Sequence, residues 1–445
     1  MNGHHHITVL GAGPAGLAVG YYAKTNDLSF TMYEASNRVG GLSSTLEYKS
    51  FFFDSGAHRF HDKNFQATSL VKKILGGNLE KITISSCIYH EGRMLNFPFS
   101  PLNLIKNIGF FSFLKAFVEI CSIRFKKYDN SFKGFAFKHY GKTFAKIFLL
   151  NYSHKLWGVP CSQLSCDVHG ERLHGLNIKN ILLKNNSSVK HIEGSFYYPR
   201  NGIGQICEKM KDFCGVENIL IDSEVTKVLH NNKRIEGIEI NNKKIVKVDS
   251  VISTLPLNVI LKIMSPKVPK EIFSLIASLD FRSLIVVFLV INKDSVTKHG
   301  SVYFPSLEFP FVRICEPKNR SDAMSIKGKT SLAIEITCWK DDLLWGSEDS
   351  VLIDRVCSNL IKIGWLKRDE IDGSKVVRFQ NAYPVLKLNN NSIVEKLSVF
   401  LNSFSNLKFL GRNARFSYSW IHDQLRWGQE IIGESMEDID RAELQ

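Results

Sequence analysis

The stretch from residue 7 to residue 41 most constrains how this chain can fold, because it contains a complete binding motif for one end of a dinucleotide. Ile7-Thr8-Val9-Leu10 is typical of a short buried strand, and Gly11-Ala12-Gly13-Pro14-Ala15-Gly16 leads from it into an apolar helical segment. Gly11 permits a tight turn, Gly13 lets a pyrophosphate approach the backbone, and Gly16 lets the helix pack closely on the sheet. The N–H groups at the start of the helix then face the phosphates.

A second strand, Phe30-Thr31-Met32-Tyr33, ends at Glu34. This places a carboxylate about 20 residues after the glycine motif, where it can accept hydrogen bonds from a ribose. A glycine motif alone is weak evidence, but one set between a strand and a helix, with an acid after the next strand, is much stronger. The pattern predicts a Rossmann-like α/β domain.

The residues after Glu34 distinguish between the cofactors that such a motif binds. Arg38-Val39-Gly40-Gly41 follows almost directly, and a nicotinamide-binding domain has no need of this second glycine pair. The combination resembles the large flavoprotein superfamily of flavin amine oxidases, protoporphyrinogen oxidases, phytoene desaturases and UDP-galactopyranose mutases. There the arginine and the glycines lie along the pyrophosphate and the flavin edge, where arginine neutralises phosphate and glycine exposes N–H groups. The resemblance implies FAD rather than NAD.

Length and composition bound the remaining possibilities. The chain has 445 residues, which predicts two domains, and its 44% apolar and 22% charged residues are typical of a globular protein. Nine cysteines without a CxxC pair indicate thiols in a reducing compartment and predict neither disulfides nor a metal site. We therefore expect a cytoplasmic protein without a bound metal.

The formal net charge of +14 restricts the partners. Short basic clusters such as Arg124-Phe125-Lys126-Lys127 occur without a nucleic-acid-binding motif, so we expect no nucleic acid. An anionic substrate or peripheral contact with an anionic membrane is favoured, because a positive field concentrates either of them. A plain effect on solubility is the alternative.

A polar loop follows the glycine pair. Phe51-Phe52-Phe53-Asp54 leads into Ser55-Gly56-Ala57-His58-Arg59-Phe60-His61, which resembles a loop of UDP-galactopyranose mutase and protoporphyrinogen-oxidase-like proteins that passes the flavin face. Neutral histidine can exchange a proton near pH 7. The alternative is that these side chains only bind the cofactor or each other.

The middle of the chain is rich in phenylalanine. The stretch 102–125 is apolar and helical in pattern and has a basic end, which is typical of a packed helix in a second domain and also of a helix that lies on a membrane. We favour the packed helix. Further on, the run from Tyr152 through Trp157-Gly158-Val159-Pro160 to Arg172, and the run from Phe196 to Gln205, resemble a protoporphyrinogen-oxidase-like branch.

Alternating short runs between residues 219 and 248, with asparagine pairs as turns, predict a small antiparallel meander. The resemblance implies that Val225 holds the adenine through its backbone. Nearly continuous apolar runs at 284–291 and 331–337 predict the sheet of a substrate domain. Between them lies Arg313, which we interpret as a partner for an anionic group or, alternatively, as an ion-pair partner of Glu316 or Glu335.

The C-terminal region completes the flavin motifs. Leu407-Lys408-Phe409-Leu410-Gly411-Arg412 matches the C-terminal FAD motif in outline, and Tyr418 follows it. Family members commonly have an asparagine and a small residue after this tyrosine, whereas this chain has Ser419-Trp420. The difference leaves FAD binding intact and puts the substrate and reaction in question.

These observations predict an FAD-binding domain from residues 1–94, 196–258 and 391–445, and a discontinuous α+β substrate domain from 95–195 and 259–390. The implied function is oxidation of a small-molecule, anionic or sugar-linked biosynthetic intermediate by hydride transfer to flavin N5. The alternative is a non-redox mutase of a nucleotide sugar. The residues predicted to act on substrate are His58, Arg59, His61, Arg313 and Tyr418. The residues predicted to bind FAD are Gly11, Gly13, Pro14, Ala15, Gly16, Glu34, Ala35, Arg38, Gly40, Gly41, Leu42, Val225, Gly411 and Arg412.

Overall fold

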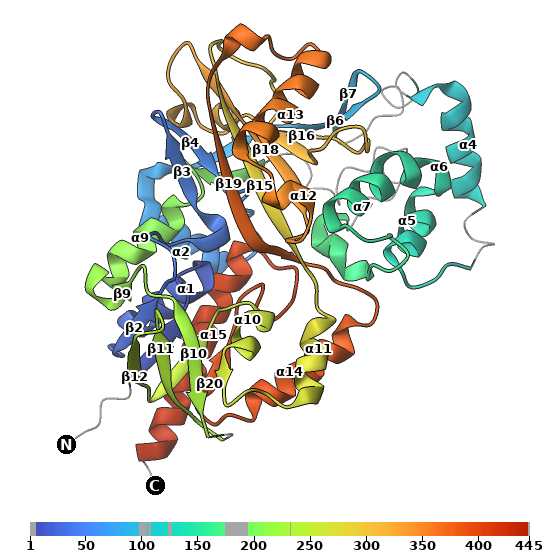
Figure 1. Cartoon of the computed structure of the whole chain (residues 1–445). Helices are drawn as coiled ribbons and strands as arrows, with labels where there is room; N and C mark the ends of the chain where they lie inside the picture. The colour runs from blue at the N-terminus through green and yellow to red at the C-terminus, as the bar shows by residue number, and fades with distance from the viewer. Residues whose placement is uncertain are drawn as a thin grey trace.

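The computed structural model describes residues 6–97, 105, 108–122, 127–173, 195–231 and 233–443. Figure 1 shows a parallel sheet with its helices in the lower part of the molecule, a long mixed sheet above it, and a lobe of short helices to one side. The parallel sheet and the mixed sheet are each built from segments that are far apart in the sequence, so neither region is a continuous piece of chain.

The lower region is built on a five-stranded sheet in which every neighbouring pair is parallel and β1 is central. Its strands, in sheet order, are β20 (Leu407–Phe409), β13 (Ser250–Ser253), β1 (Ile7–Leu10), β2 (Phe30–Tyr33) and β9 (Ile219–Leu220). The helices near it are α1 (Pro14–Thr25), α2 (Phe65–Leu75), α9 (Gln205–Cys214) and α15 (Ile421–Glu443). This arrangement confirms the predicted Rossmann-like fold.

The residues of β1 alternate between two cores, as a buried strand requires. Ile7 and Val9 pack with the helices, whereas Leu10 packs with the antiparallel meander on the opposite face. Helix α15 lies close against α1, since a Cβ atom at Gly428 would be 2.5 Å from that of Ala18. The parallel sheet is therefore covered by helices on one face and by strands on the other.

The predicted meander is present as a four-stranded sheet in the order β12-β11-β10-β14. Its strands are β10 (Val225–His230), β11 (Ile235–Ile240), β12 (Lys244–Lys247) and β14 (Met264–Ser265), of which β14 is parallel to β10. Helices α10 (Leu257–Lys262), α11 (Lys270–Ala277) and α14 (Asn390–Asn402) lie beside it (Figure 1).

The upper region is a seven-stranded, mainly antiparallel sheet in the order β19-β15-β18-β17-β16-β6-β7. Its strands are β6 (Ser86–His90), β7 (Arg93–Phe97), β15 (Phe281–Ile291), β16 (Ser301–Tyr303), β17 (Arg313–Cys315), β18 (Thr330–Cys338) and β19 (Ile371–Pro384). Both apolar runs predicted as strands are thus confirmed, as parts of β15 and β18.

Both faces of this sheet are covered, which explains why every residue of β15 is buried. Ile285, Val287 and Leu289 face helix α13 (Asp349–Lys362), near the short α12 (Leu343–Gly346). Leu284, Val286 and Phe288 face the hairpin of β3 (Thr45–Tyr48) and β4 (Phe51–Asp54), where the rings of Phe53 and Phe288 stack with centroids 4.0 Å apart. A two-stranded sheet of β5 (Leu79–Thr83) and β8 (Ser195–Pro199) joins the two regions.

The lateral lobe contains α4 (Phe110–Cys121), α5 (Phe132–Tyr140), α6 (Lys142–Phe144), the π-helical segment η4 (Ala145–Leu150) and α7 (Asn151–Trp157). Its apolar core includes Phe144 and Phe148. Lys155 attaches the lobe to the upper sheet by donating hydrogen bonds of 2.8 Å to the carbonyls of Phe304 and Ser306. Burial lowers the pKa of Lys155 to about 7.

Helix α4 forms the centre of the predicted helical stretch 102–125, and residues 102–104, 106–107 and 123–125 of that stretch lie outside the described residues. The predicted division into two domains stays a prediction. One of its boundaries, between residues 94 and 95, falls inside β7. In the part of the chain that the structure describes, none of the helices has both the length and the apolar composition needed to cross a bilayer.

Candidate cofactor and active site

Two glycine turns create an open channel at the N-terminus of α1. Gly13 is the N-cap residue of this helix, and a Cβ atom added to it would meet no atom within 4 Å. A Cβ atom on Gly41 would lie 3.6 Å from the Cα of Gly13, so the two turns face each other. The N–H of Gly40 donates to the carbonyl of Ala12 at 2.8 Å and holds them together. A pyrophosphate fits this channel, since backbone donors and the helix dipole are accessible there.

Gly11 and Gly16 have a different role, because both are crowded. Gly11 has a φ of 98°, which favours glycine, and a Cβ there would lie 2.5 Å from the Oγ1 of Thr254. A Cβ at Gly16 would lie 1.9 Å from the carbonyl oxygen of Gly11. Pro14 and Ala15, both buried, begin the helix between these glycines. The turn can therefore form only with glycine at both positions.

Glu34 is fixed at the end of β2. Its Oε2 accepts the N–H of Ala12 at 2.8 Å, and its Oε1 accepts the N–H and the hydroxyl of Ser36 at 3.0 and 2.7 Å. Oε2 retains a lone pair, because a carboxylate oxygen accepts two hydrogen bonds. The N–H of Ser223 donates to the carbonyl of Glu34 at 2.8 Å, which brings the start of β10, Val225, to the same edge. The carboxylate is thus oriented with capacity for a ribose hydroxyl.

Ala35 and Arg38 occupy the connection from Glu34 to the second glycine turn. Ala35 is exposed and Arg38 is half-buried. The Ser36 hydroxyl donates to the carbonyl of Arg38 at 2.7 Å, which fixes the backbone next to Gly40. Arg38 therefore starts beside the channel in which a phosphate would lie.

The other end of the site is a cavity of about 70 Å³ between the two large sheets. Residues from five separate parts of the sequence line it, and six of them were predicted as site residues: Leu42, His58, Arg59, Arg313, Arg412 and Tyr418. Further lining residues include Ser55 and Trp420, which lie in segments that the sequence analysis singled out, and three that the sequence did not indicate: Leu284, Tyr383 and Gln424. These come from strand pairing and from a helix start, and no local motif distinguishes them.

His58 is a neutral imidazole in this cavity. Burial, together with the positive charges of Arg412 and Arg313, lowers the pKa of His58 from 6.5 to about 3. The neutral ring can both donate and accept a hydrogen bond, whereas an imidazolium can only donate.

Arg59 is held against the wall of the cavity. Its Nη2 donates to the hydroxyl of Ser86 at 2.6 Å, and its guanidinium lies 5.2 Å from the centre of the Phe196 ring. Burial lowers the pKa of Arg59 from its ordinary value. His61 is buried behind this wall, edge-on to Trp420 at 5.6 Å, and is not among the residues that line the cavity. It is the predicted catalytic residue that the structure does not bring to the cavity.

Arg313 lines the cavity as half of a buried ion pair. Its Nε and Nη2 donate to the two carboxylate oxygens of Glu335 at 3.0 and 2.5 Å. Glu335 also accepts the N–H of Ala57 at 2.9 Å, which ties the His58 loop to β18. Of the two interpretations of Arg313, the ion pair is present, and its partner is Glu335 rather than Glu316. Arg313 therefore adds little net charge to the cavity.

Arg412 enters the cavity from the C-terminal motif. Its guanidinium donates to the carbonyl of Ala382 and lies 5.1 Å and 5.9 Å from the ring centres of Tyr383 and Tyr418. Gly411, where a Cβ would be 3.3 Å from that of Ala15, brings this segment against the start of α1. The phosphate channel and the ring cavity are thus adjoining parts of one site.

Two orphaned groups support the fit of FAD. Among the described residues, the buried hydroxyls of Ser44 and Ser419 have no hydrogen-bond partner, and Ser419 lines the cavity. A buried polar group without a partner is costly, and a bound molecule with polar edges would satisfy it. The open channel at Gly13, the acid at Glu34 and these hydroxyls together fit an elongated dinucleotide.

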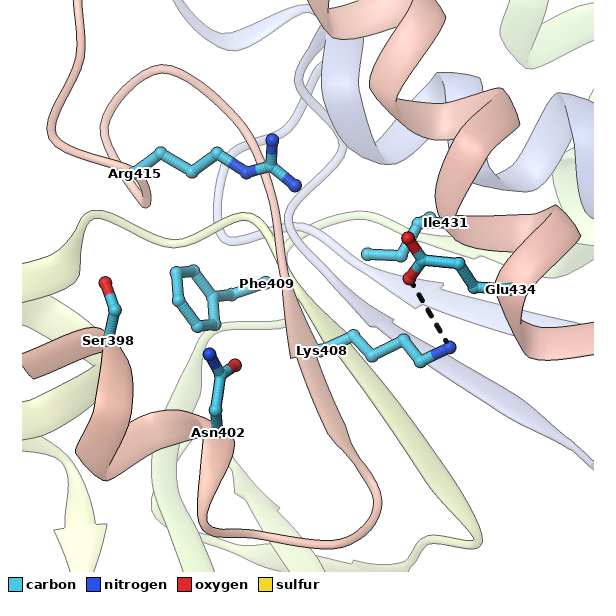
Figure 2. A pocket seen from close by; sticks show the side chains of 7 residues that line it. All are labelled: Ser398, Asn402, Lys408, Phe409, Arg415, Ile431 and Glu434. Carbon is cyan, nitrogen blue, oxygen red and sulfur yellow. Dashed lines mark ion pairs between the residues drawn. The ribbon is translucent and has the colours of Figure 1, made fainter. Parts of the chain in front are cut away.

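A second, larger cleft of about 390 Å³ lies between α14, β20 and α15 (Figure 2). Lys408 crosses it to form an ion pair with Glu434 at 3.8 Å, and Phe409 lies between Asn402 and Arg415. None of the residues predicted for the site lines this cleft. It lacks a glycine turn and a helix N-terminus directed into it, so it is not where the cofactor is held.

Comparison with solved structures shows a shared fold. A reduced UDP-galactopyranose mutase superposes with a TM-score of 0.84 and 20% identity over 97% of this chain and 96% of that one. A candidate protoporphyrinogen oxidase from an Exiguobacterium species superposes with a TM-score of 0.78 and 16% identity over 97% and 98%.

Sequence relatives match over shorter stretches. The mitochondrial protoporphyrinogen oxidase of Nicotiana tabacum is 26% identical over 147 residues, which cover 31% of this chain and 29% of that protein. The coproporphyrinogen III oxidase of Bacillus subtilis is 27% identical over 107 residues, covering 23% and 22%. The matched stretches thus span less than a third of these relatives.

The model of the family described as flavin containing amine oxidoreductase matches residues 14–386. The match covers most of the chain and includes the second glycine pair and the His58 loop. The family is flavin-containing, which confirms the prediction of FAD instead of NAD. The chain belongs to the flavin-containing amine oxidoreductase family, and its cofactor is FAD.

Proposed function

We propose that this protein is an FAD-dependent oxidoreductase that oxidises a small-molecule biosynthetic intermediate, anionic or sugar-linked, by hydride transfer to flavin N5. The observation that carries the proposal is the single cavity in which His58, Arg59, Arg412 and Tyr418 meet, next to the glycine channel. Family membership supports the type of reaction, and the cavity supports the type of substrate.

The chain provides binding and orientation at both ends of the cofactor. Gly13, Gly41 and the start of α1 would hold the pyrophosphate, Glu34 would hold a ribose, and Leu42, Tyr418 and Ser419 would surround the ring. When bound, FAD supplies the hydride acceptor. The aromatic and aliphatic walls exclude water, which strengthens the electrostatic interactions inside.

The cations of the cavity favour an anionic substrate. The charge of Arg313 is largely balanced by Glu335, so we assign the attraction of an anionic ligand mainly to Arg59 and Arg412, which also line the cavity. Arg59 donates to the hydroxyl of Ser86, and Arg412 donates to the carbonyl of Ala382. We expect the two positive charges to attract a carboxylate or a phosphate and to disfavour a cationic amine.

His58 would accept the proton that accompanies hydride loss. Its pKa of about 3 results first from burial and then from the charges of Arg412, Arg313 and Arg320. An anionic ligand near these arginines would offset their part of the shift, whereas the effect of burial would remain. His58 would therefore be a stronger base with an anionic ligand bound than without it.

The proposal is tested by mixing the FAD-bound protein, without oxygen, with single candidate substrates and following flavin absorbance. Coproporphyrinogen III and protoporphyrinogen IX carry carboxylates, whereas putrescine is a dication of a kind that some amine oxidases use, so putrescine is a matched control. Reduction by an anionic compound and none by putrescine supports the proposal. Reduction by putrescine alone contradicts the assigned role of Arg59 and Arg412.

A nucleotide-sugar mutase is the second candidate, favoured by the TM-score of 0.84 with UDP-galactopyranose mutase over nearly the full length of both chains. Electron counting separates the two. An oxidoreductase takes two electrons from each substrate molecule, whereas a mutase needs one priming reduction and then converts UDP-galactopyranose without consuming reductant. Isomerisation of this sugar by the dithionite-reduced protein would replace the first proposal with the second.

A further inference from the structure

Helix α4, in the lateral lobe, has one packed face and one exposed face. On the packed face Ala116 is buried, Phe113 joins the apolar core of the lobe, and Glu119 accepts the N–H and the hydroxyl of Thr143 at 2.7 and 3.0 Å. These contacts come from α6 and fix the rotation of α4 about its axis. This packing therefore directs the other face of α4 away from the lobe.

The exposed face is apolar throughout a continuous stripe. Five large side chains within nine consecutive positions are exposed: Phe110 (59%), Phe111 (85%), Leu114 (46%), Phe117 (46%) and Val118 (59%). Pairs of these residues are three, four, seven or eight positions apart, which places them on one side of the helix. Exposed apolar residues elsewhere in the described chain are more dispersed. A gathering of this kind marks an interaction surface.

The lobe that carries this stripe is also the most basic part of the chain. Residues 105–157 contain ten lysines and arginines and only two acidic residues, a surplus of eight in a chain whose formal net charge is +14. Both acids are used internally, Glu119 by Thr143 and Asp129 by Ser131. The lysines at 115, 127, 133, 138, 142 and 146 are exposed. A partner that offers both an apolar layer and negative charge therefore suits this lobe.

The position of α4 suits contact with an extended surface. In Figure 1 this helix lies at the outer edge of the molecule, with α5 and α6 between it and the upper sheet. A helix of 12 residues is about 18 Å long, too short to cross a bilayer of about 30 Å and suited to lying in its interface.

We propose that α4 docks the protein on an anionic lipid membrane, with its phenylalanine stripe inserted among the acyl chains and the basic charge of the lobe attracted to the lipid phosphates. Phenylalanine and leucine on one face and lysine around it are the composition of interfacial helices. Anionic headgroups supply the charge that the lobe lacks.

The test is sedimentation of the full-length, FAD-bound protein with large vesicles of phosphatidylcholine alone, or with about one quarter phosphatidylglycerol. We expect binding to the anionic vesicles, weak binding to the neutral ones, and a decrease as salt screens the lysines. The variant F111S/F117S should lose roughly tenfold or more in binding, because each buried ring adds apolar area. Replacing Lys138 and Lys142 by glutamate should weaken binding to anionic vesicles only.

The matched control is L343S, which removes an equally exposed apolar side chain, 93% accessible, from the unrelated helix α12. This control should bind vesicles like the wild type, and the flavin spectrum of each variant shows that it is folded. Absence of vesicle binding by the wild type, or equal binding by F111S/F117S, overturns the proposal. The proposal is also overturned if the wild type self-associates but does not bind vesicles, and if F111S/F117S abolishes this self-association. The stripe would then be a contact between copies of the chain.

Discussion

The two ends of the cofactor site are built in opposite ways. The phosphate end consists of backbone from residues close in sequence, with open space in front of Gly13 and one oriented carboxylate, Glu34. The ring end consists of charged and aromatic side chains from distant segments, brought together by the seven-stranded sheet and the C-terminal motif. We therefore expect the phosphate end to determine which cofactor binds and the ring end to determine what the cofactor does.

The difference also has an electrostatic side. At the phosphate end the positive potential comes from N–H groups and a helix terminus, which do not titrate. At the ring end it comes from arginines whose fields, together with burial, shift the pKa of His58. Changes at the first end should alter binding at all pH values, whereas changes at the second should alter rates and their pH dependence.

The largest effect should come from G13D. It places a carboxylate in the channel proposed for the pyrophosphate, and the repulsion should abolish FAD binding. The fold should stay intact, because a Cβ atom added at Gly13 meets no atom within 4 Å. Visible absorbance of the purified protein measures the bound flavin. Gly433 is also open and lies in α15, so G433D is the matched control and should stay yellow. A G13D protein that is still yellow would show that the phosphates bind somewhere else.

Breaking the Arg313–Glu335 pair should mainly affect folding. R313L leaves Glu335, which is 2% exposed, as an uncompensated buried charge and should lower the free energy of unfolding by about 3–5 kcal/mol. R313L/E335L should recover much of this loss, as measured by denaturant unfolding. If R313L is as stable as the wild type and has lost only activity, Arg313 instead binds the substrate.

H58A and R59A should separate binding from turnover. Both variants should keep FAD and reduce it about a hundredfold more slowly with substrate, because each loses a proton-transfer or electrostatic partner. Anaerobic stopped-flow absorbance measures this rate. Arg368 is exposed and pairs with Asp354 far from the cavity, so R368A is the control. If both variants reduce flavin at the wild-type rate at every pH, these residues are structural and the chemistry involves other groups.

The smallest effect concerns stability in acid. In the flavin-free protein His58 has a pKa of about 3, whereas in the unfolded chain it is 6.5. As the pH falls below 6.5 the unfolded state binds a proton that the folded state does not, so stability falls by at most about 1.4 kcal/mol per pH unit. H58Q should flatten this dependence between about pH 7 and about pH 5, as seen in urea midpoints. An unchanged slope would mean that His58 titrates normally.

The sequence predicted the two glycine turns and the position of Glu34, because their determinants are local, whereas the assignment of these residues to FAD stays a prediction. A turn such as Gly11 to Gly16 and an acid after the next strand depend on neighbouring residues alone, and the structure places them as expected. The parallel sheet, the meander and the β15–β18 pair followed from hydrophobic periodicity in the same way.

The ring end was predictable only in part. The loops that contain His58, Arg59, Arg412 and Tyr418 could be located by resemblance, but Tyr383 and Gln424 enter the cavity through strand pairing and helix placement. Neither the choice of Glu335 over Glu316 nor the withdrawal of His61 behind Trp420 has a local signal. The first depends on register, since Arg313 lies opposite Glu335 in the β17–β18 ladder. The second depends on tertiary packing, since the ring of His61 lies against that of Trp420.

The most direct test of the central claim, that one FAD spans both ends, is calorimetric titration of flavin-stripped protein with FAD and, in parallel, with NAD, FMN and ADP. The account predicts one tightly bound FAD per chain, weaker binding of ADP at the phosphate end and of FMN at the ring end, and no displacement of FAD by NAD. Tight binding of NAD in place of FAD, or equal affinities for FMN and FAD, would contradict it.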